Sequence, residues 1–113
     1  MAYDERLAER VGALVARRRD FHQQKMFGGV GFLLRGNMCV GVWKEYLILR
    51  LGKEWAAPNA LLRKAKKWGR PFDITGRAMK GWVMVGSKGT QSAAALKEWV
   101  KQAIAFVSKL PRK

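Results

Sequence analysis

The most constraining feature of this sequence is a glycine-rich apolar stretch, KMFGGVGFLLRGNMCVGVW, which runs from Lys25 to Trp43. It holds five glycines in nineteen positions. Glycine at this density is typical either of a loop whose bare backbone binds phosphate or of strands that another group approaches closely. The phosphate-loop alternatives fail, because position 34 of a GxGxxG pattern is Leu34 and no Gly-Lys-Ser/Thr follows Gly31 at the required spacing.

The same stretch fits a β-hairpin. Gly36-Asn37 is a turn pair that tolerates positive φ, and a chain folded there places Phe32 opposite Gly41. In this register the Phe32 ring covers the bare backbone of Gly41. Gly28-Gly29 then opens the first strand, as a bulge or as room for a packed neighbour. We therefore expect the glycines to serve sheet architecture rather than chemistry.

The predicted register leaves apolar side chains on both faces of the hairpin. One face holds Leu33, Val40 and Val42, and the other holds Val30, Phe32, Leu34, Cys39 and Trp43. An antiparallel sheet usually has one wet face. Two interpretations stay open: helices cover one face and the second is partly covered, or the second face meets another chain, such as a second copy.

The rest of the chain alternates between helical and strand patterns. A helical stripe predicts a helix over about residues 3–19, whose last turn holds the Arg17-Arg18-Arg19 triplet, an arrangement that suits the helix dipole. We expect further strands at 46–51, at about 70–74 and at 81–85. Further helices are expected at about 55–68 and from Thr90 or Ser92 to Pro111. The order α-β-β-β-α-β-β-α predicts one α+β domain over residues 1–113, with an antiparallel sheet and helices packed on it.

The charge of the chain is extreme. Twenty-three Lys and Arg face eight Asp and Glu, which gives a formal net charge of +15. Such a field attracts nucleic acid, acidic proteins or anionic lipid, whereas solubility usually needs a net charge of only about 2–8. Cations concentrate in the expected second helix and beyond it. The candidate residues for binding nucleic acid or an acidic partner are Arg63, Lys64, Lys66, Lys67, Arg70, Arg77 and Lys80.

Two tryptophans lie beside these cations in the sequence. Trp68 follows Lys66 and Lys67, and Trp82 follows Lys80 at a spacing of two. Aromatic rings beside cations can stack on single-stranded bases. Both rings also fall on predicted apolar faces, and packing in the core is the interpretation that we favour.

The sequence offers little for catalysis. His22 is the one His and Cys39 the one Cys, so no metal site is expected, and a thiol in an apolar strand is typical of a buried structural residue. No pair of carboxylates stands out for acid–base work. We therefore expect no enzyme and no cofactor. The N-terminus lacks a signal peptide and no apolar run could span a bilayer, which predicts a cytoplasmic protein with no membrane partner.

Several blocks of the sequence resemble the TfoX N-terminal domain family, the domain of the TfoX/Sxy competence regulators, and the resemblance covers nearly the whole chain as a single-domain member. The blocks are Met-Ala-Tyr-Asp at the start, Lys-Met-Phe-Gly-Gly, Gly-Asn-Met-Cys, Leu-Arg-Leu-Gly and Phe-Asp-Ile-Thr-Gly-Arg-Ala-Met-Lys-Gly-Trp-Val. The positions that carry the motif are Met26, Phe27, Gly28, Gly29, Gly76, Arg77, Met79, Lys80, Gly81 and Trp82.

This resemblance implies a two-layer fold with a five-stranded antiparallel sheet, similar to secretion chaperones, and no catalytic activity. It also implies a regulatory role in the expression of competence genes, exerted together with the cyclic-AMP receptor protein at promoters. No helix carries a helix-turn-helix signature, so this chain is not expected to read a promoter sequence alone.

Three functional hypotheses follow. The first is a non-catalytic regulatory domain that acts through protein or nucleic-acid contacts. The second is a basic module that binds nucleic acid without sequence preference. The third is a chaperone-like homodimer that holds an extended peptide along its sheet. The cations favour the first two, and the apolar hairpin favours the third.

Overall fold

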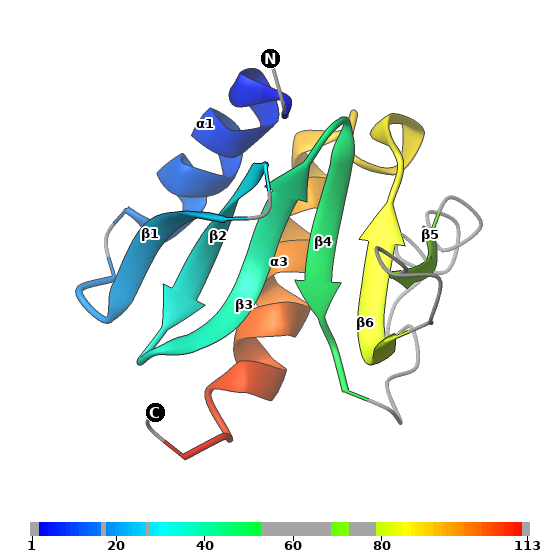
Figure 1. The fold of residues 1–113 in the computed structure, drawn as a ribbon. Helices are drawn as coiled ribbons and strands as arrows, with labels where there is room; N and C mark the ends of the chain where they lie inside the picture. Colours follow the sequence, from blue (N-terminus) through cyan, green and yellow to red (C-terminus); the bar gives the residue numbers. More distant parts are fainter. Residues whose placement is uncertain (1–2, 17, 27, 53–68, 73–78, 112–113) are drawn as a thin grey trace.

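The computed structural model describes residues 3–16, 18–26, 28–52, 69–72 and 79–111, and for Met26, residues 69–72, Met79 and Lys80 it describes the backbone. In this part of the chain the fold has two layers, with helices α1 (Glu5–Val15) and α3 (Ala93–Val107) packed on one face of an antiparallel sheet (Figure 1). The strands are β1 (Phe21–Met26), β2 (Gly29–Leu34), β3 (Asn37–Trp43), β4 (Tyr46–Arg50), β5 (Gly69–Phe72) and β6 (Met79–Val85), and a short 3-10 helix η2 (Ser87–Gly89) precedes α3.

The predicted fold class, a two-layer α+β domain with an antiparallel sheet, is confirmed, and so is the order of the predicted strands. The expected helix at 55–68 lies outside the described residues. The sheet has the order β1-β2-β3-β4-β6-β5, so it has six strands where we expected five. The additional strand is β1, with the sequence FHQQKM. It gives no alternating apolar pattern because it lies at the edge of the sheet, where Phe21 packs against the core but the side chains of residues 22–25 are all exposed.

Helix α1 is shorter than the sequence predicted. The Asp4 side chain caps it by accepting a hydrogen bond from the backbone N–H of Leu7 at 3.0 Å. The helix ends at Val15 and has no basic residue in its last turn. Arg18 and Arg19 therefore lie beyond the helix, and the helix dipole does not explain them.

The β2–β3 hairpin turns one residue earlier than predicted. Arg35 and Gly36 form the turn with φ values of 53° and 86°, and Leu34 pairs with Asn37. Positive φ at both central residues is typical of a type I′ turn. Asn37, which we expected in the turn, is instead the first residue of β3 and is buried. Its side-chain Nδ2 donates a hydrogen bond to the carbonyl oxygen of Pro111 at 2.9 Å.

The predicted register of the hairpin is wrong for the same reason. Gly41 lies opposite Gly31, and Phe32 lies opposite Val40 rather than over Gly41. A β-bulge between Phe32 and Leu33 shifts the register and leaves Cys39 without a directly opposite residue. The assignment of side chains to the two faces of the hairpin therefore changes as well. The residues in the core between the sheet and the helices are Val30, Phe32, Leu34, Cys39, Val40 and Val42.

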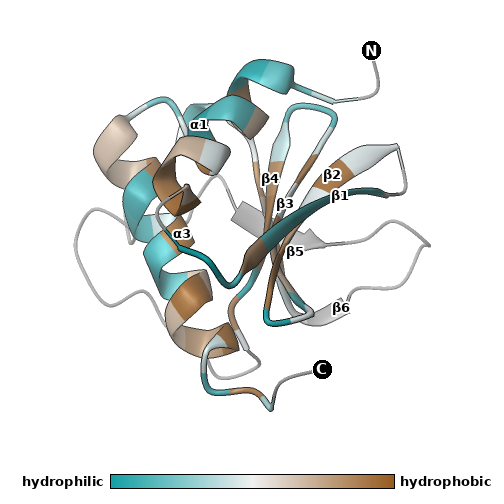
Figure 2. Cartoon of the chain, turned by 90° about the vertical axis from the view of Figure 1, so that its left-hand side faces the viewer, coloured by the Kyte–Doolittle hydropathy of each residue, from teal (hydrophilic) through white to brown (hydrophobic). Residues whose placement is uncertain are grey.

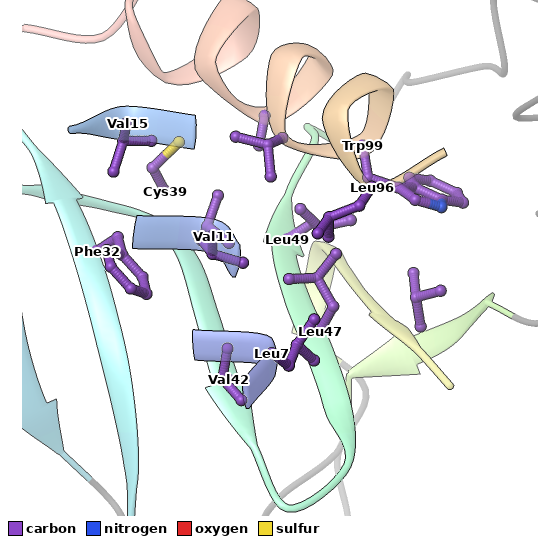
Figure 3. Packing of buried hydrophobic residues seen from close by; sticks show 14 of the residues in the cluster. Leu7, Val11, Val15, Phe32, Cys39, Val42, Leu47, Leu49, Leu96 and Trp99 are labelled. Carbon is purple, nitrogen blue, oxygen red and sulfur yellow. The ribbon is translucent and has the colours of Figure 1, made fainter. Parts of the chain in front are cut away.

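This core lies between the sheet and the two helices (Figure 3). Trp99 of α3, Val11 of α1 and Leu49 of β4 are each 0% exposed. Complete burial of such side chains stabilises the fold by about 1.5–3 kcal/mol each. The third predicted strand is confirmed, with Leu47, Leu49 and Leu51 buried.

The last predicted helix is also confirmed, but it ends at Val107 rather than at Pro111. Ser92, one of two predicted caps, accepts a hydrogen bond from the backbone N–H of Ala95 at 3.3 Å. Thr90 instead donates its hydroxyl hydrogen bond to the carbonyl oxygen of Ser87. The buried stripe of α3 consists of Ala95, Leu96, Trp99, Val100, Ala103 and Val107.

Candidate polyanion-binding surface

The predicted basic patch falls mostly outside the described residues. Arg63, Lys64, Lys66, Lys67 and Arg77 lie there. The backbone of Arg70 belongs to β5 and that of Lys80 to β6, the two strands that pair at one edge of the sheet. The patch therefore stays a prediction, and the site below is built from other cations.

The family-motif glycines that the structure describes have architectural roles. Gly29 begins β2, and a Cβ atom there would overlap the carbonyl oxygen of Val42. Gly81 has a φ of 86°, and its carbonyl oxygen accepts hydrogen bonds from the backbone N–H groups of Leu51 at 2.8 Å and Gly52 at 3.1 Å. The prediction that the glycines of residues 25–43 serve the sheet is confirmed at Gly29. Of the other motif positions, Phe27, Gly76 and Arg77 lie outside the described residues.

Four of the six described acidic side chains lie at one end of the molecule. Asp4, Glu5 and Glu9 lie at the start of α1, at the top of Figure 1. The backbone N–H of Asp4 donates to the carbonyl oxygen of Lys44 at 2.7 Å, which brings the Lys44-Glu45 turn to the same end. Arg6 and Arg10 of α1 and Lys44 lie at this end as well, so the negative charge of these carboxylates is largely balanced there.

Two arginines share one carboxylate at the opposite end. Arg18 Nε lies 3.5 Å from Asp20 Oδ1, and Arg35 Nε lies 3.4 Å from Asp20 Oδ2. The side chains of Arg18 and Arg35 are 40% and 42% exposed, against 26% for Asp20. One carboxylate cannot neutralise two guanidinium groups, so an exposed positive charge remains at this point.

The local backbone fixes both arginines. The backbone N–H of Arg35 donates to the carbonyl oxygen of Asp20 at 3.0 Å, which joins the β2–β3 turn to the start of β1. The backbone N–H of Arg18 donates to the carbonyl oxygen of Val15 at 3.0 Å, and its guanidinium carbon lies 5.8 Å from the centre of the Phe21 ring. A guanidinium over an aromatic ring gains an additional attraction.

The end of α3 reaches the same place. The hydrogen bond between Asn37 and Pro111 holds the segment after α3 against the β2–β3 turn, and exposed Lys109 precedes Pro111 by two residues. The start of β1, the β2–β3 turn and the segment after α3 lie on the left-hand side of Figure 1, in its middle and lower part. We define the basic end as Arg18, Arg19, Arg35 and Lys109, all exposed.

The basic end is a feature that sequence reasoning missed. The Arg17-Arg18-Arg19 triplet was visible, but a helix extended to residue 19 explained it. Arg35 lies far away in the sequence, and only the pairing of β1 with β2 brings it to Asp20. One residue in the sequence could have indicated this site. Asp20 lies between the arginine triplet and the next strand, and a carboxylate there can hold a neighbouring arginine in place.

Aromatic side chains gather on the sheet face away from the helices. Trp43 and Tyr46 lie with ring centres 6.3 Å apart, and Trp82 joins them around buried Ile48 and Met84. Arg50 lies over the Trp82 ring at 5.5 Å, where the sequence suggested Lys80. Lys44 lies over Trp43 at 4.6 Å. Both tryptophans are half-buried, and the Trp68 alternative lies outside the described residues.

The reactive residues of the described part lie apart from one another. Cys39 is buried between the sheet and α1, beside Val15 (Figure 3), and burial raises the pKa of its thiol to about 12. A neutral buried thiol is a poor nucleophile. His22 is exposed on β1. In the described ranges no three His, Cys, Asp or Glu side chains come together in a way that could hold a metal ion.

These features define a small α+β domain with a cluster of exposed cations at its basic end. A family model, the TfoX N-terminal domain, matches residues 13–107, and the chain belongs to this family of non-catalytic domains. No curated protein and no solved structure matches the chain. None of the described helices has the length and apolar character that crossing a bilayer requires.

Proposed function

We propose that this domain is a non-catalytic regulatory module that binds a polyanionic macromolecule through its basic end, with nucleic acid as the partner. The observation that carries the proposal is the excess of positive charge at the basic end, where two guanidinium groups share the single carboxylate of Asp20. A polyanion that approaches this protein is attracted to that excess.

The geometry of the arginine pair suits phosphate. Each guanidinium approaches Asp20 through its Nε and carries further N–H donors, and the side chains of Arg18 and Arg35 are 40% and 42% exposed. Guanidinium groups bind phosphate oxygens through paired N–H donors. Such contacts hold a nucleic-acid backbone without reading its sequence. We therefore propose a module whose target sequence, if it has one, is read by a partner protein.

In this proposal the domain works in the cytoplasm as part of transcription regulation, the role that the TfoX resemblance implies. The basic segment Arg63–Arg70 with Arg77 and Lys80 would add further phosphate contacts. A nucleic-acid complex formed by several such contacts loses affinity steeply as salt rises, by orders of magnitude between about 50 and 200 mM.

The test is a titration of two unrelated labelled DNA duplexes, followed by fluorescence anisotropy at both salt concentrations. Arg18→Ala with Arg35→Ala should weaken binding at least about fivefold and reduce the salt slope by about two, because two phosphate contacts are lost. Lys97→Ala with Lys101→Ala is the matched control, since both lysines are exposed on α3 and the charge change is equal.

Two results would contradict the proposal. One is the absence of any binding at the lower salt concentration. The other is an equal loss of affinity in the α3 control, which would mean that net charge alone attracts DNA. Strong preference for one duplex would contradict the backbone-only mode of contact.

A further inference from the structure

The outer edge of β1 is open in the described part of the chain. β1 is the terminal strand of the sheet and pairs on one side with β2. Figure 2 looks onto this edge, with the largely hydrophilic β1 in front. The side chains of His22, Gln23, Gln24 and Lys25 are all exposed, so the helices cover neither face of the strand there.

The register determines which backbone groups face outward. The Asp20 carbonyl oxygen accepts a hydrogen bond from Arg35 N–H, and the β1–β2 pairing continues from there without a shift. Hydrogen-bonded pairs alternate with non-hydrogen-bonded pairs in an antiparallel ladder. His22 and Gln24 therefore bond to β2, whereas the N–H and C=O groups of Phe21, Gln23 and Lys25 point away from the sheet.

We propose that this edge binds an extended acidic segment of a partner protein, which adds a strand antiparallel to β1. Main-chain hydrogen bonds at Phe21, Gln23 and Lys25 would supply the pairing. Cations flank the edge at both ends, with Arg18 and Arg19 before the strand and Lys25 near its end, and all three are exposed. Acidic side chains on the added strand complement that charge.

The same charges disfavour a second copy as the occupant. An antiparallel pairing of β1 with itself centred on Gln23 places Lys25 of each copy opposite Phe21 of the other, and β1 itself has no acidic side chain that could pair with this lysine. Two copies also repel each other on approach, because each carries a formal net charge of +15. Nucleic acid is not suited to this edge either, because its backbone has no amide groups to continue the ladder. The edge shares Arg18 and Arg19 with the basic end, so an acidic segment and nucleic acid would compete for these two side chains, whereas the main-chain pairing at β1 does not depend on nucleic-acid binding.

The first experiment is amide hydrogen exchange by NMR on the whole chain, with a short peptide of alternating Glu and Thr as the probe. In the free protein the N–H groups of Phe21, Gln23 and Lys25 should exchange quickly, and those of His22 and Gln24 slowly. The peptide should slow the exchange of the Phe21, Gln23 and Lys25 N–H groups. A peptide of the same length with Lys in place of Glu should leave their exchange rates unchanged.

Two variants at one position separate backbone pairing from charge. Gln23→Pro removes one outward N–H and places a ring at the edge, without removing a ladder bond to β2. It should weaken peptide binding by about tenfold or more. Gln23→Ala removes only an exposed side chain and should bind within about threefold of the parent. A peptide N-methylated at alternate residues keeps its charge but should lose binding.

Several results would overturn the proposal. Absence of acidic-peptide binding would do so, as would binding that survives both N-methylation and Gln23→Pro. Displacement of the peptide by single-stranded DNA, with no change on N-methylation, would identify the edge as part of a polyanion site. A dimer in sedimentation that Gln23→Pro dissociates, without peptide binding, would identify a second copy as the occupant.

Discussion

Replacement of Asp20 by Asn should have opposite effects on folding and on nucleic-acid binding. The side chain joins two arginines at 3.5 and 3.4 Å, and each pair is partly exposed. Partly exposed ion pairs contribute about 0.2–1 kcal/mol each, so the two together contribute at most about 2 kcal/mol. Asp20→Asn removes both and leaves Arg18 and Arg35 to repel each other. We expect the free energy of unfolding to fall by about 0.5–2 kcal/mol.

Urea denaturation at low salt and at about 1 M NaCl measures this effect. Because the Debye length falls to about 3 Å at 1 M salt, the difference between parent and variant should shrink there. DNA affinity should rise in the variant, because the basic end gains one unit of positive charge. An unfolding free energy that is unchanged, or equally lowered at both salt concentrations, would refute the ion-pair reasoning. The single variant Arg35→Gln, together with the double variant Asp20→Asn with Arg35→Gln, completes a double-mutant cycle that measures the coupling of this pair.

Three further predictions concern single residues. Gly29→Ala should lower the free energy of unfolding by at least about 2 kcal/mol, because the new Cβ overlaps the Val42 carbonyl oxygen and the backbone must shift. Gly12→Ala in α1 should instead raise it by about 0.5–1 kcal/mol, since its Cβ would meet the Phe32 ring at an ordinary 3.8 Å; equal urea midpoints for these two variants would contradict both. Burial raises the pKa of Cys39 from 9.0 to about 12, so stability should fall as pH rises between these values, and a thiol reagent at pH 8 should label Cys39 much faster in urea than in the folded protein. Labelling at equal rates would show that the thiol is accessible.

The buried parts of this fold could be predicted because burial leaves a period in the sequence. Leu47, Leu49 and Leu51 alternate along one strand, and the stripe of α3 follows helical spacing from Leu96 to Val107. The Ser92 cap follows from the hydrogen-bonding needs of a helix start. These signals are local, and each was confirmed.

The parts that could not be predicted depend on contacts between distant segments. The hairpin turned at Arg35-Gly36 because Asn37 is held by Pro111, at the far end of the chain. β1 carries no apolar period because it is an edge. Local propensity favoured Gly36-Asn37 as the turn, and a tertiary hydrogen bond overrode it. The basic end was missed for the same reason, since Asp20 meets Arg35 only once β1 pairs with β2.

An open edge strand normally favours aggregation, and the charges around β1 explain how this protein can keep one. Natural sheets protect exposed edges with charged side chains, lysine above all. Lys25 lies on β1, Arg18 and Arg19 precede the strand, and the chain carries a formal net charge of +15, so two copies that approach edge to edge repel each other. The repulsion that prevents self-pairing becomes attraction when the added strand is acidic. The same few cations therefore protect the edge from copies of this chain and select the partner that we propose for it.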